Sequence, residues 1–236
     1  MEVIKSENYE IYKLENSIYK ISFHSTAYSL VNSLVRSRLI MGSSTDENYK
    51  TITFKAESVK TFCQYMHDYA VRTGKKALLV SDAARMIRSL VHQLSYLLEK
   101  DSSTIIGYNP EELIVINDEK FAFLGSELVA NFDADTEYAI ISYPFSSKDF
   151  FFSPEIIRIK EIPAYVHYKT SYFSLACLII YALLGDNEFY TEYLRHKQTD
   201  KILEYIDNHP IKQTKIYWLL SRCLVEEPNN RSIILI

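Results

Sequence analysis

The N-terminal quarter of the chain combines strand-like and helical patterns. Residues 8–23 contain two runs of β-branched and aromatic residues around a central Glu-Asn pair, which predicts a β-hairpin. Apolar residues in 25–40 recur at helical spacing, with Ser25 or Thr26 as the expected N-cap. Residues 49–54 are rich in β-branched and aromatic side chains and predict a short strand.

Helical spacing dominates the remainder of the chain. One helix is predicted over 58–71. A stronger one, capped by Ser81-Asp82 and ending at Asp101, is predicted because its apolar residues recur every three or four positions. Residues 126–152 show no regular pattern. Two short strands are predicted at 112–116 and 120–124, and further helices over about 154–160, 171–185, 188–208 and 212–225.

The segment 172–184 is apolar on every face, and a helix of this kind in a globular protein is normally surrounded by other helices. We therefore expect an α+β protein with a single domain over 1–236. It would consist of a small β-containing lobe, 1–56, and a large, mainly helical lobe, 57–236, built around the apolar helix.

Composition narrows the function classes. Hydrophobic residues make up 47% of the 236 residues and charged residues 24%, a balance typical of globular proteins. The net charge of −4 argues against a protein that binds nucleic acid through bulk charge. Three widely spaced cysteines, an odd number, favour a reducing compartment, so we expect a cytoplasmic or otherwise intracellular location. The longest apolar stretch, Leu175–Leu184, is shorter than the ~20 residues of a membrane span.

The order of these elements and three motifs resemble a protein kinase. Ser153-Pro154-Glu155 resembles the A-P-E that closes a kinase activation segment, and 171–185 resembles the central D-x-x-S-L-G helix. Residues 223–231 resemble the late C-L-x-x-D-P-x-x-R segment. In kinases the glutamate of A-P-E pairs with the late arginine, so the resemblance implies an ion pair between Glu155 and Arg231.

The residues that kinases need for phosphoryl transfer are replaced here. The motif H-R-D-L-K-P-E-N aligns with 105–112, so Gly107 replaces the aspartate that orients the attacking hydroxyl and Glu112 replaces a metal-binding asparagine. The metal-binding aspartate of D-F-G falls on Gly125. Glycine has no side chain with which to accept a proton or bind a metal.

The small lobe lacks further kinase features. The chain has only 5 glycines and the first is Gly42, so no Gly-rich phosphate loop is possible in the first strands. Lys20 resembles the phosphate-binding lysine, but residues 17–45 contain no acid to pair with it. Lys20 is therefore interpreted as an outward-facing strand residue.

The resemblance thus implies a degenerate member of the kinase-like superfamily, a pseudokinase with a reduced small lobe and no bound nucleotide, metal or other cofactor. Its function would be that of a protein-binding scaffold or assembly subunit. Two alternatives stay open: an atypical active kinase whose acids have moved to Glu111, Glu112 or Glu127, and an interaction module of unrelated fold.

Aromatic residues gather in 131–152, where a kinase would have its activation segment. Aromatic anchors with polar spacers are typical of interface cores, so this segment is a candidate surface for a protein partner. Packing of the same residues on their own lobe is an equal alternative. The candidates are Phe132, Tyr138, Tyr143, Phe145, Phe150 and Phe151.

Cys63 and His67 are four residues apart on a predicted helix and could face each other. A nucleophile in the middle of a helix lacks an oxyanion hole, so Cys63 is interpreted as a core cysteine beside a partly exposed histidine. No pair of histidines has metal-ligand spacing.

Overall fold

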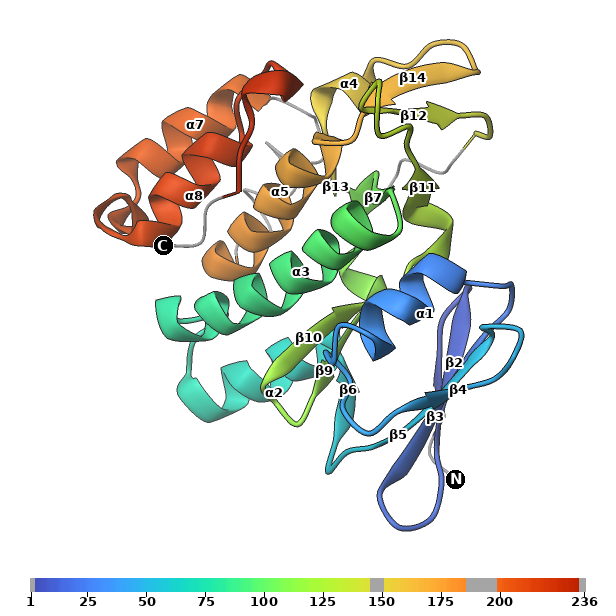
Figure 1. Ribbon diagram of the computed structural model, residues 1–236. Coiled ribbons are helices and arrows are strands. Elements are labelled where there is room, and N and C mark those ends of the chain that lie inside the picture. The colour runs from blue at the N-terminus through green and yellow to red at the C-terminus, as the bar shows by residue number, and fades with distance from the viewer. Residues whose placement is uncertain (1–2, 145–150, 186–198, 234–236) are drawn as a thin grey trace.

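A small sheet precedes a large group of helices in this structure, a computed structural model that describes residues 3–144, 151–185 and 199–233 (Figure 1). The chain is mixed α+β, as predicted. The small lobe, 3–56, has an antiparallel sheet of strand order β1-β2-β3-β5-β4 and one helix. The elements of the small lobe are β1 (Val3–Lys5), β2 (Tyr9–Lys13), β3 (Ile18–Phe23), α1 (Tyr28–Val35), β4 (Ser44–Thr45) and β5 (Thr51–Lys55).

The large lobe, 57–233, contains the remaining helices and short strand pairs. Its helices are α2 (Phe62–Thr73), α3 (Val80–Lys100), α4 (Pro154–Ile157), α5 (Thr170–Leu184), α7 (Thr199–Asn208) and α8 (Lys215–Cys223). Its strands are β6 (Val59–Thr61), β7 (Ser103–Ile105), β8 (Gly107–Tyr108), β9 (Leu113–Ile116), β10 (Lys120–Phe123), β11 (Val129–Asn131), β12 (Tyr138–Ile141), β13 (Phe151–Phe152) and β14 (Ala164–His167).

The predicted N-terminal hairpin is confirmed as β2 and β3, which pair from Tyr9 opposite Phe23 to Lys13 opposite Tyr19. The alternation of the sequence sets the buried face, because Tyr19, Ile21 and Phe23 are all buried while the residues between them are not. The predicted strand at 49–54 is β5, which pairs with β3.

Helix α1 is shorter than the predicted 25–40. It begins at Tyr28, and its N-cap residue is Ala27, without a capping side chain, so neither Ser25 nor Thr26 caps it. The helix ends at Val35, and Arg38 soon adopts a left-handed backbone with φ of 63°. This conformation is incompatible with a continuing α-helix.

The predicted helix at 58–71 begins later than expected, because residues 59–61 form strand β6 instead. Val59 lies opposite Ile116 of β9, so β6 joins the hairpin of β9 and β10. Helix α2 then begins after Thr61, whose side chain accepts a hydrogen bond from Gln64 N in a reciprocal capping box. A pairing across more than 50 residues of sequence therefore overrides the local helical pattern.

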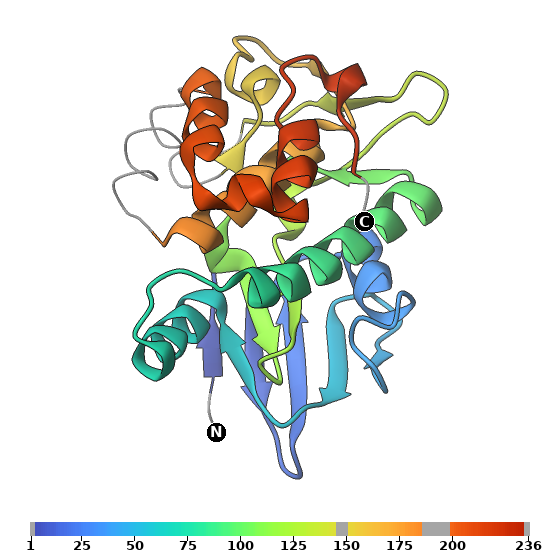
Figure 2. The ribbon, with the colours of Figure 1, turned by 90° about the vertical axis from the view of Figure 1, so that its left-hand side faces the viewer.

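Helix α3 lies between α1 and β10 on one side and α5 on the other (Figures 1 and 2). The apolar residues that predicted it are buried, from Ala83 at its start to Leu97 near its end. The predicted cap is wrong, because Ser81 and Asp82 lie inside the helix and the N-cap residue is Leu79. Its buried Gln93 exchanges two hydrogen bonds of 2.9 Å with the backbone of Phe123 in β10, and its Nε2 lies 3.3 Å from Ser33 Oγ in α1. The contact with Ser33 joins the two lobes through a fully buried polar group, and the contacts with Phe123 fix Gln93 within the large lobe.

Helix α5 is the apolar helix predicted at the centre of the large lobe. It is buried on nearly every face and contacts α3, α8, β8 and β13. One continuous hydrophobic core runs from Tyr9 in the small lobe to Leu224 after α8. Within the described ranges, no helix combines the length and the apolarity needed to cross a membrane.

The remaining predictions are confirmed in outline and corrected in detail. The strands predicted at 112–116 and 120–124 are β9 and β10. The helix predicted at 154–160 ends at Ile157, and that predicted at 212–225 is α8. Of the helix predicted at 188–208, the structure describes only α7, since 186–198 lie outside the described residues. The stretch 126–152, predicted to be irregular, contains β11, β12 and β13.

Candidate functional site

A cleft of about 680 Å³ lies between the turn that joins β1 to β2 and the large lobe. The turn supplies one wall, and the start of α2 and the segment after β8 supply the others. The lining residues are Lys5, Ser6, Glu7, Asn8, Thr61, Cys63, Asn109, Glu111, Glu112 and Glu127. The cleft therefore brings together the three acids of the active-kinase alternative, Glu111, Glu112 and Glu127, with the β1–β2 turn.

Glu112 is a buried carboxylate, 4% exposed, that lines this cleft. A single-turn 3₁₀ helix at Pro110–Glu112, capped by the side chain of Asn109, holds it in place. Its Oε1 accepts hydrogen bonds from Ser6 Oγ at 2.8 Å and from Asn8 Nδ2 at 3.2 Å. Its Oε2 is buried and has no hydrogen-bond partner among the described residues. The turn between β1 and β2 is thus tied to the large lobe through one oxygen of Glu112.

The electrostatic environment of Glu112 is negative. Burial, together with the charges of Glu127 and Glu111, raises the pKa of Glu112 to about 7. Burial and the charge of Glu7 also raise the pKa of Glu127. The one cationic residue of the lining, Lys5, is exposed, and its Nζ lies 3.2 Å from Glu10, which is not a lining residue.

Replacing Glu112 with glutamine should make the protein more stable at pH 8 and remove part of its pH dependence. The carboxyl group has a higher pKa in the folded than in the unfolded chain, so the folded state binds its proton more tightly. This contribution is present below about pH 4.5 and is lost as the pH rises through 7, with a total of about 3 kcal/mol.

Urea unfolding of wild type and E112Q between pH 5 and pH 8 measures this difference. The exposed Glu119→Gln is the matched control and should follow the wild-type curve. If the stability of wild type relative to E112Q does not fall between pH 5 and pH 8, ionisation of Glu112 does not destabilise the folded protein.

Gly107 and Gly125, the positions aligned with the two kinase aspartates, are both closely packed. A Cβ atom on Gly107 would lie 2.3 Å from Cε1 of Phe152, because β8 pairs with β13. A Cβ on Gly125 would lie 2.6 Å from Cζ of Phe123. Aromatic rings therefore fill the space that larger residues would need at both positions.

Lys20 does not line the cleft. It is half-buried on the face of β3 opposite the buried Tyr19 and Ile21. Its location agrees with the interpretation as a strand residue that faces away from the core.

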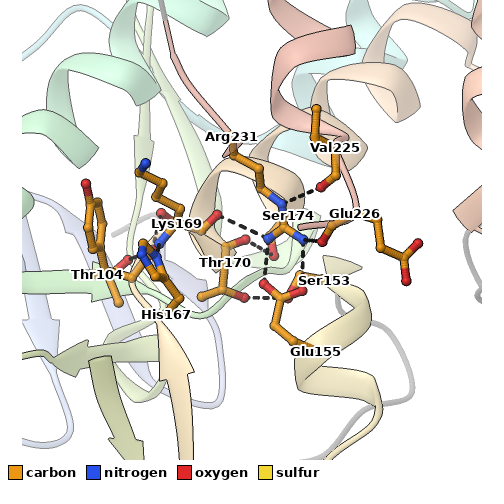
Figure 3. Close-up of polar contacts among 12 residues, drawn as sticks. Thr104, Ser153, Glu155, His167, Lys169, Thr170, Ser174, Val225, Glu226 and Arg231 are labelled. Atoms are coloured by element: carbon orange, nitrogen blue, oxygen red, sulfur yellow. Dashed lines mark hydrogen bonds and ion pairs between the residues drawn. The ribbon is translucent and has the colours of Figure 1, made fainter. Parts of the chain in front are cut away.

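The structure brings Glu155 and Arg231 together, although 75 residues separate them in the sequence (Figure 3). Nη2 of Arg231 donates to Glu155 Oε2 at 2.9 Å, while Nη1 donates to Oε1. The guanidinium is completely buried, and its carbon lies 5.1 Å above the ring of Phe173 in α5.

The remaining N–H groups of Arg231 are also satisfied (Figure 3). Nε donates to Val225 O at 2.7 Å, and Nη2 also donates to Glu226 O at 2.8 Å. Nη1 lies 3.4 Å from Lys169 O just before α5. Arg231 thus joins α4 through a bidentate ion pair, and it joins the start of α5 and the segment after α8 through hydrogen bonds to their carbonyl groups.

The predicted partner-binding aromatics have different environments. Phe151 is 3% exposed and packs 5.6 Å from the ring of Tyr181 in α5, so its assignment to a partner surface is wrong. Phe132 is half-buried and stacks on Tyr168 at 5.0 Å. Tyr138 and Tyr143 are exposed. Phe145 and Phe150 lie outside the described residues.

An exposed apolar patch, the β12–β14 patch, consists of Tyr138, Ile140 and Tyr165, which are 40%, 52% and 69% exposed. Ile140 and Tyr165 lie directly opposite each other on the paired strands, and Tyr138 lies on the same face. A groove of about 300 Å³ lies between β12 and α4 and includes Tyr143 and Ile162. Ile140 and Tyr165 were not among the predicted partner-binding residues, although the alternation at 138–141 is a usable strand signal.

Cys63 is not the core cysteine that the sequence suggested, since it is exposed on α2 and lines the cleft. Partial desolvation of the thiol nevertheless raises its pKa, and the charge of Glu111 adds to this. Its thiolate is therefore disfavoured, the opposite of what an activated nucleophile requires.

Across the described parts of the chain, no three His, Cys, Asp or Glu side chains come together in a way that could hold a metal ion. Comparison with protein-family models and with curated proteins finds no match to this chain.

Proposed function

We propose that this chain is a kinase-like domain without catalytic activity, a pseudokinase, that acts as a protein-binding scaffold. The order of elements supports the kinase-like fold: a five-stranded sheet with one helix, a connecting segment, and a helical lobe around a buried apolar helix. The buried pair of Glu155 and Arg231 adds to this support. The cleft beneath the β1–β2 turn would then correspond to the nucleotide site of a kinase.

The charge of this cleft is the observation that carries the proposal. Phosphate groups bind to Lys and Arg side chains, to backbone N–H groups of Gly-rich loops and to bound cations. In this protein the wall formed by the β1–β2 turn carries Glu7. Glu111, Glu112 and Glu127 lie on the other walls of the cleft. These carboxylates would repel a triphosphate.

Hydrogen bonds between the lobes give further support, because kinase catalysis requires the lobes to open and close. Beyond the contacts of Glu112 and Gln93, His92 Nε2 lies 2.8 Å from Ser37 O, and Lys120 Nζ donates to Leu39 O at 3.1 Å. The segment that connects the two lobes, between β5 and β6, is also fixed, because Asn117 Oδ1 accepts a hydrogen bond from the backbone N of Glu57 at 2.8 Å. A rigid assembly of this kind suits a scaffold better than a cycling enzyme.

The alternative of an active kinase with relocated acids is favoured by one fact, that Glu111, Glu112 and Glu127 share a cleft. A thermal-shift series with ATP and Mg²⁺ separates the two functions. The pseudokinase should show no rise in melting temperature, whereas a ligand at 100 times its Kd adds about 2.7 kcal/mol of stability. Mg²⁺-dependent ATP hydrolysis that is lost in Glu112→Gln or Glu127→Gln would establish the active kinase instead.

The β12–β14 patch is the proposed docking surface for the partner. Affinity purification from cells that express the chain should recover a partner with wild type and lose it with Ile140→Asp or Tyr165→Asp. Each variant would place an unpaired carboxylate in an apolar interface, which weakens binding. Trp218→Asp, at an exposed position on α8, is the matched control and should retain the partner. Equal recovery with all variants would place the docking surface elsewhere.

A further inference from the structure

The interlobe cleft has an excess of negative charge. Glu7, Glu111 and Glu127 are exposed at its walls, Glu112 is buried within it, and the single cation, Lys5, pairs with Glu10 outside the lining. An opposite charge that entered the cleft would meet four carboxylates and one ammonium, that of Lys5, which already pairs with Glu10.

A second observation is the incomplete hydrogen bonding of Glu112. This side chain is 4% exposed, and only its Oε1 accepts hydrogen bonds, from Ser6 and Asn8, which are both uncharged. Its Oε2 is buried without a donor among the described residues. Buried carboxylates are normally satisfied by hydrogen bonds and by an opposite charge, so this oxygen lacks the partner that a cationic N–H group would supply.

The arrangement of the carboxylates determines which cation fits. A single metal ion needs several oxygens that converge on one point, and the described residues offer no group of three such side chains. The four glutamates come instead from the β1–β2 turn, the 3₁₀ helix before β9 and the segment after β10, around a cleft of about 680 Å³. Carboxylates placed on different walls of one cleft match several positive groups on one extended molecule.

We propose that the cleft binds an organic polycation, in which ammonium or guanidinium groups are separated by short apolar spacers. One cationic group would pair with the carboxylate of Glu112, and the others would pair with the glutamates at the walls. Two sources share this chemistry, a free polyamine and the lysine or arginine side chains of a basic peptide. The proposal rests on the carboxylates of the cleft and on the incomplete hydrogen bonding of Glu112, so it does not require the pseudokinase assignment.

Calorimetric titration of the full chain tests this proposal, with spermidine, a tetralysine peptide and MgCl₂ as separate probes at pH 8 and low salt. Burial raises the pKa of Glu112 to about 7, so the carboxylate is ionised at pH 8. Spermidine or tetralysine should bind saturably, and more weakly as NaCl is added. Tighter binding of spermidine identifies a free polyamine, and tighter binding of tetralysine identifies basic side chains.

Glu112→Gln should weaken the binding by about tenfold or more, because a charge-assisted hydrogen bond is lost. Glu119→Gln, which removes the same charge outside the cleft, should change the affinity less than about twofold. Circular dichroism on both variants separates lost binding from lost folding. Absence of saturable binding by both organic probes, equal affinities in the two variants, or binding of Mg²⁺ alone would overturn the proposal.

Discussion

Replacing Arg231 with alanine should destabilise the protein by about 3–5 kcal/mol, because it leaves Glu155 without its buried partner. The melting temperature should fall by roughly 6–20 °C for a domain of this size. The loss extends beyond the ion pair, since the carbonyl groups of Val225 and Glu226 also lose their donor. Thermal and urea unfolding measure the effect.

The chain provides a matched control for Arg231→Ala. Arg158 and Glu226 form an ion pair in which both side chains are 65% exposed, so Arg158→Ala should change the stability by less than about 1 kcal/mol. Arg231→Lys should recover only a small part of the loss, because an ammonium cannot form the bidentate pair. A melting temperature of Arg231→Ala within a degree or two of wild type would show that the pair contributes nothing and would count against the kinase-like alignment.

Replacing Gly107 with aspartate should damage the fold and give no ATP hydrolysis. Even the Cβ of alanine would lie 2.3 Å from the ring of Phe152, and such overpacking costs about 1–3 kcal/mol. Aspartate adds the burial of a carboxylate beside an apolar ring, so Gly107→Asp should cost several kcal/mol more. Urea unfolding measures both variants, and an ATP hydrolysis assay should stay negative.

A second substitution shows whether the contact with Phe152 is the cause. Phe152→Leu removes the ring atoms nearest to Gly107, so the combination Gly107→Ala/Phe152→Leu should lose less stability than the sum of the two single changes. Strict additivity, or a Gly107→Asp variant as stable as wild type, would mean that β8 and β13 can separate at little cost.

Local sequence patterns predicted the helices and strands in which buried residues recur at regular intervals within one segment. Helix α3 was predicted from apolar residues at helical spacing, and α5 from the absence of a polar face. The hairpin of β2 and β3 followed from two β-rich runs on either side of a short turn. In each case the residues that decide the structure are neighbours in the sequence.

The candidate site was predictable only in part. The sequence could show that Gly107 and Gly125 lack the side chains that kinases use, because that statement needs only the residue types. It could not show that Ser6 and Asn8 would bond to Glu112 across more than 100 residues, or that a buried oxygen would be left without a donor. These features arise when two lobes pack together.

By itself, the sequence determined the α+β class, the central apolar helix and the absence of the kinase aspartates at the aligned positions. Tertiary structure alone decided that Val59–Thr61 forms a strand, that β12 pairs with β14, and that Phe151 is buried while Tyr165 is exposed. The physical reason is that strand pairing and burial depend on contacts between distant segments. Periodicity reports which face of an element is apolar, but only its packing partners decide whether that face is covered.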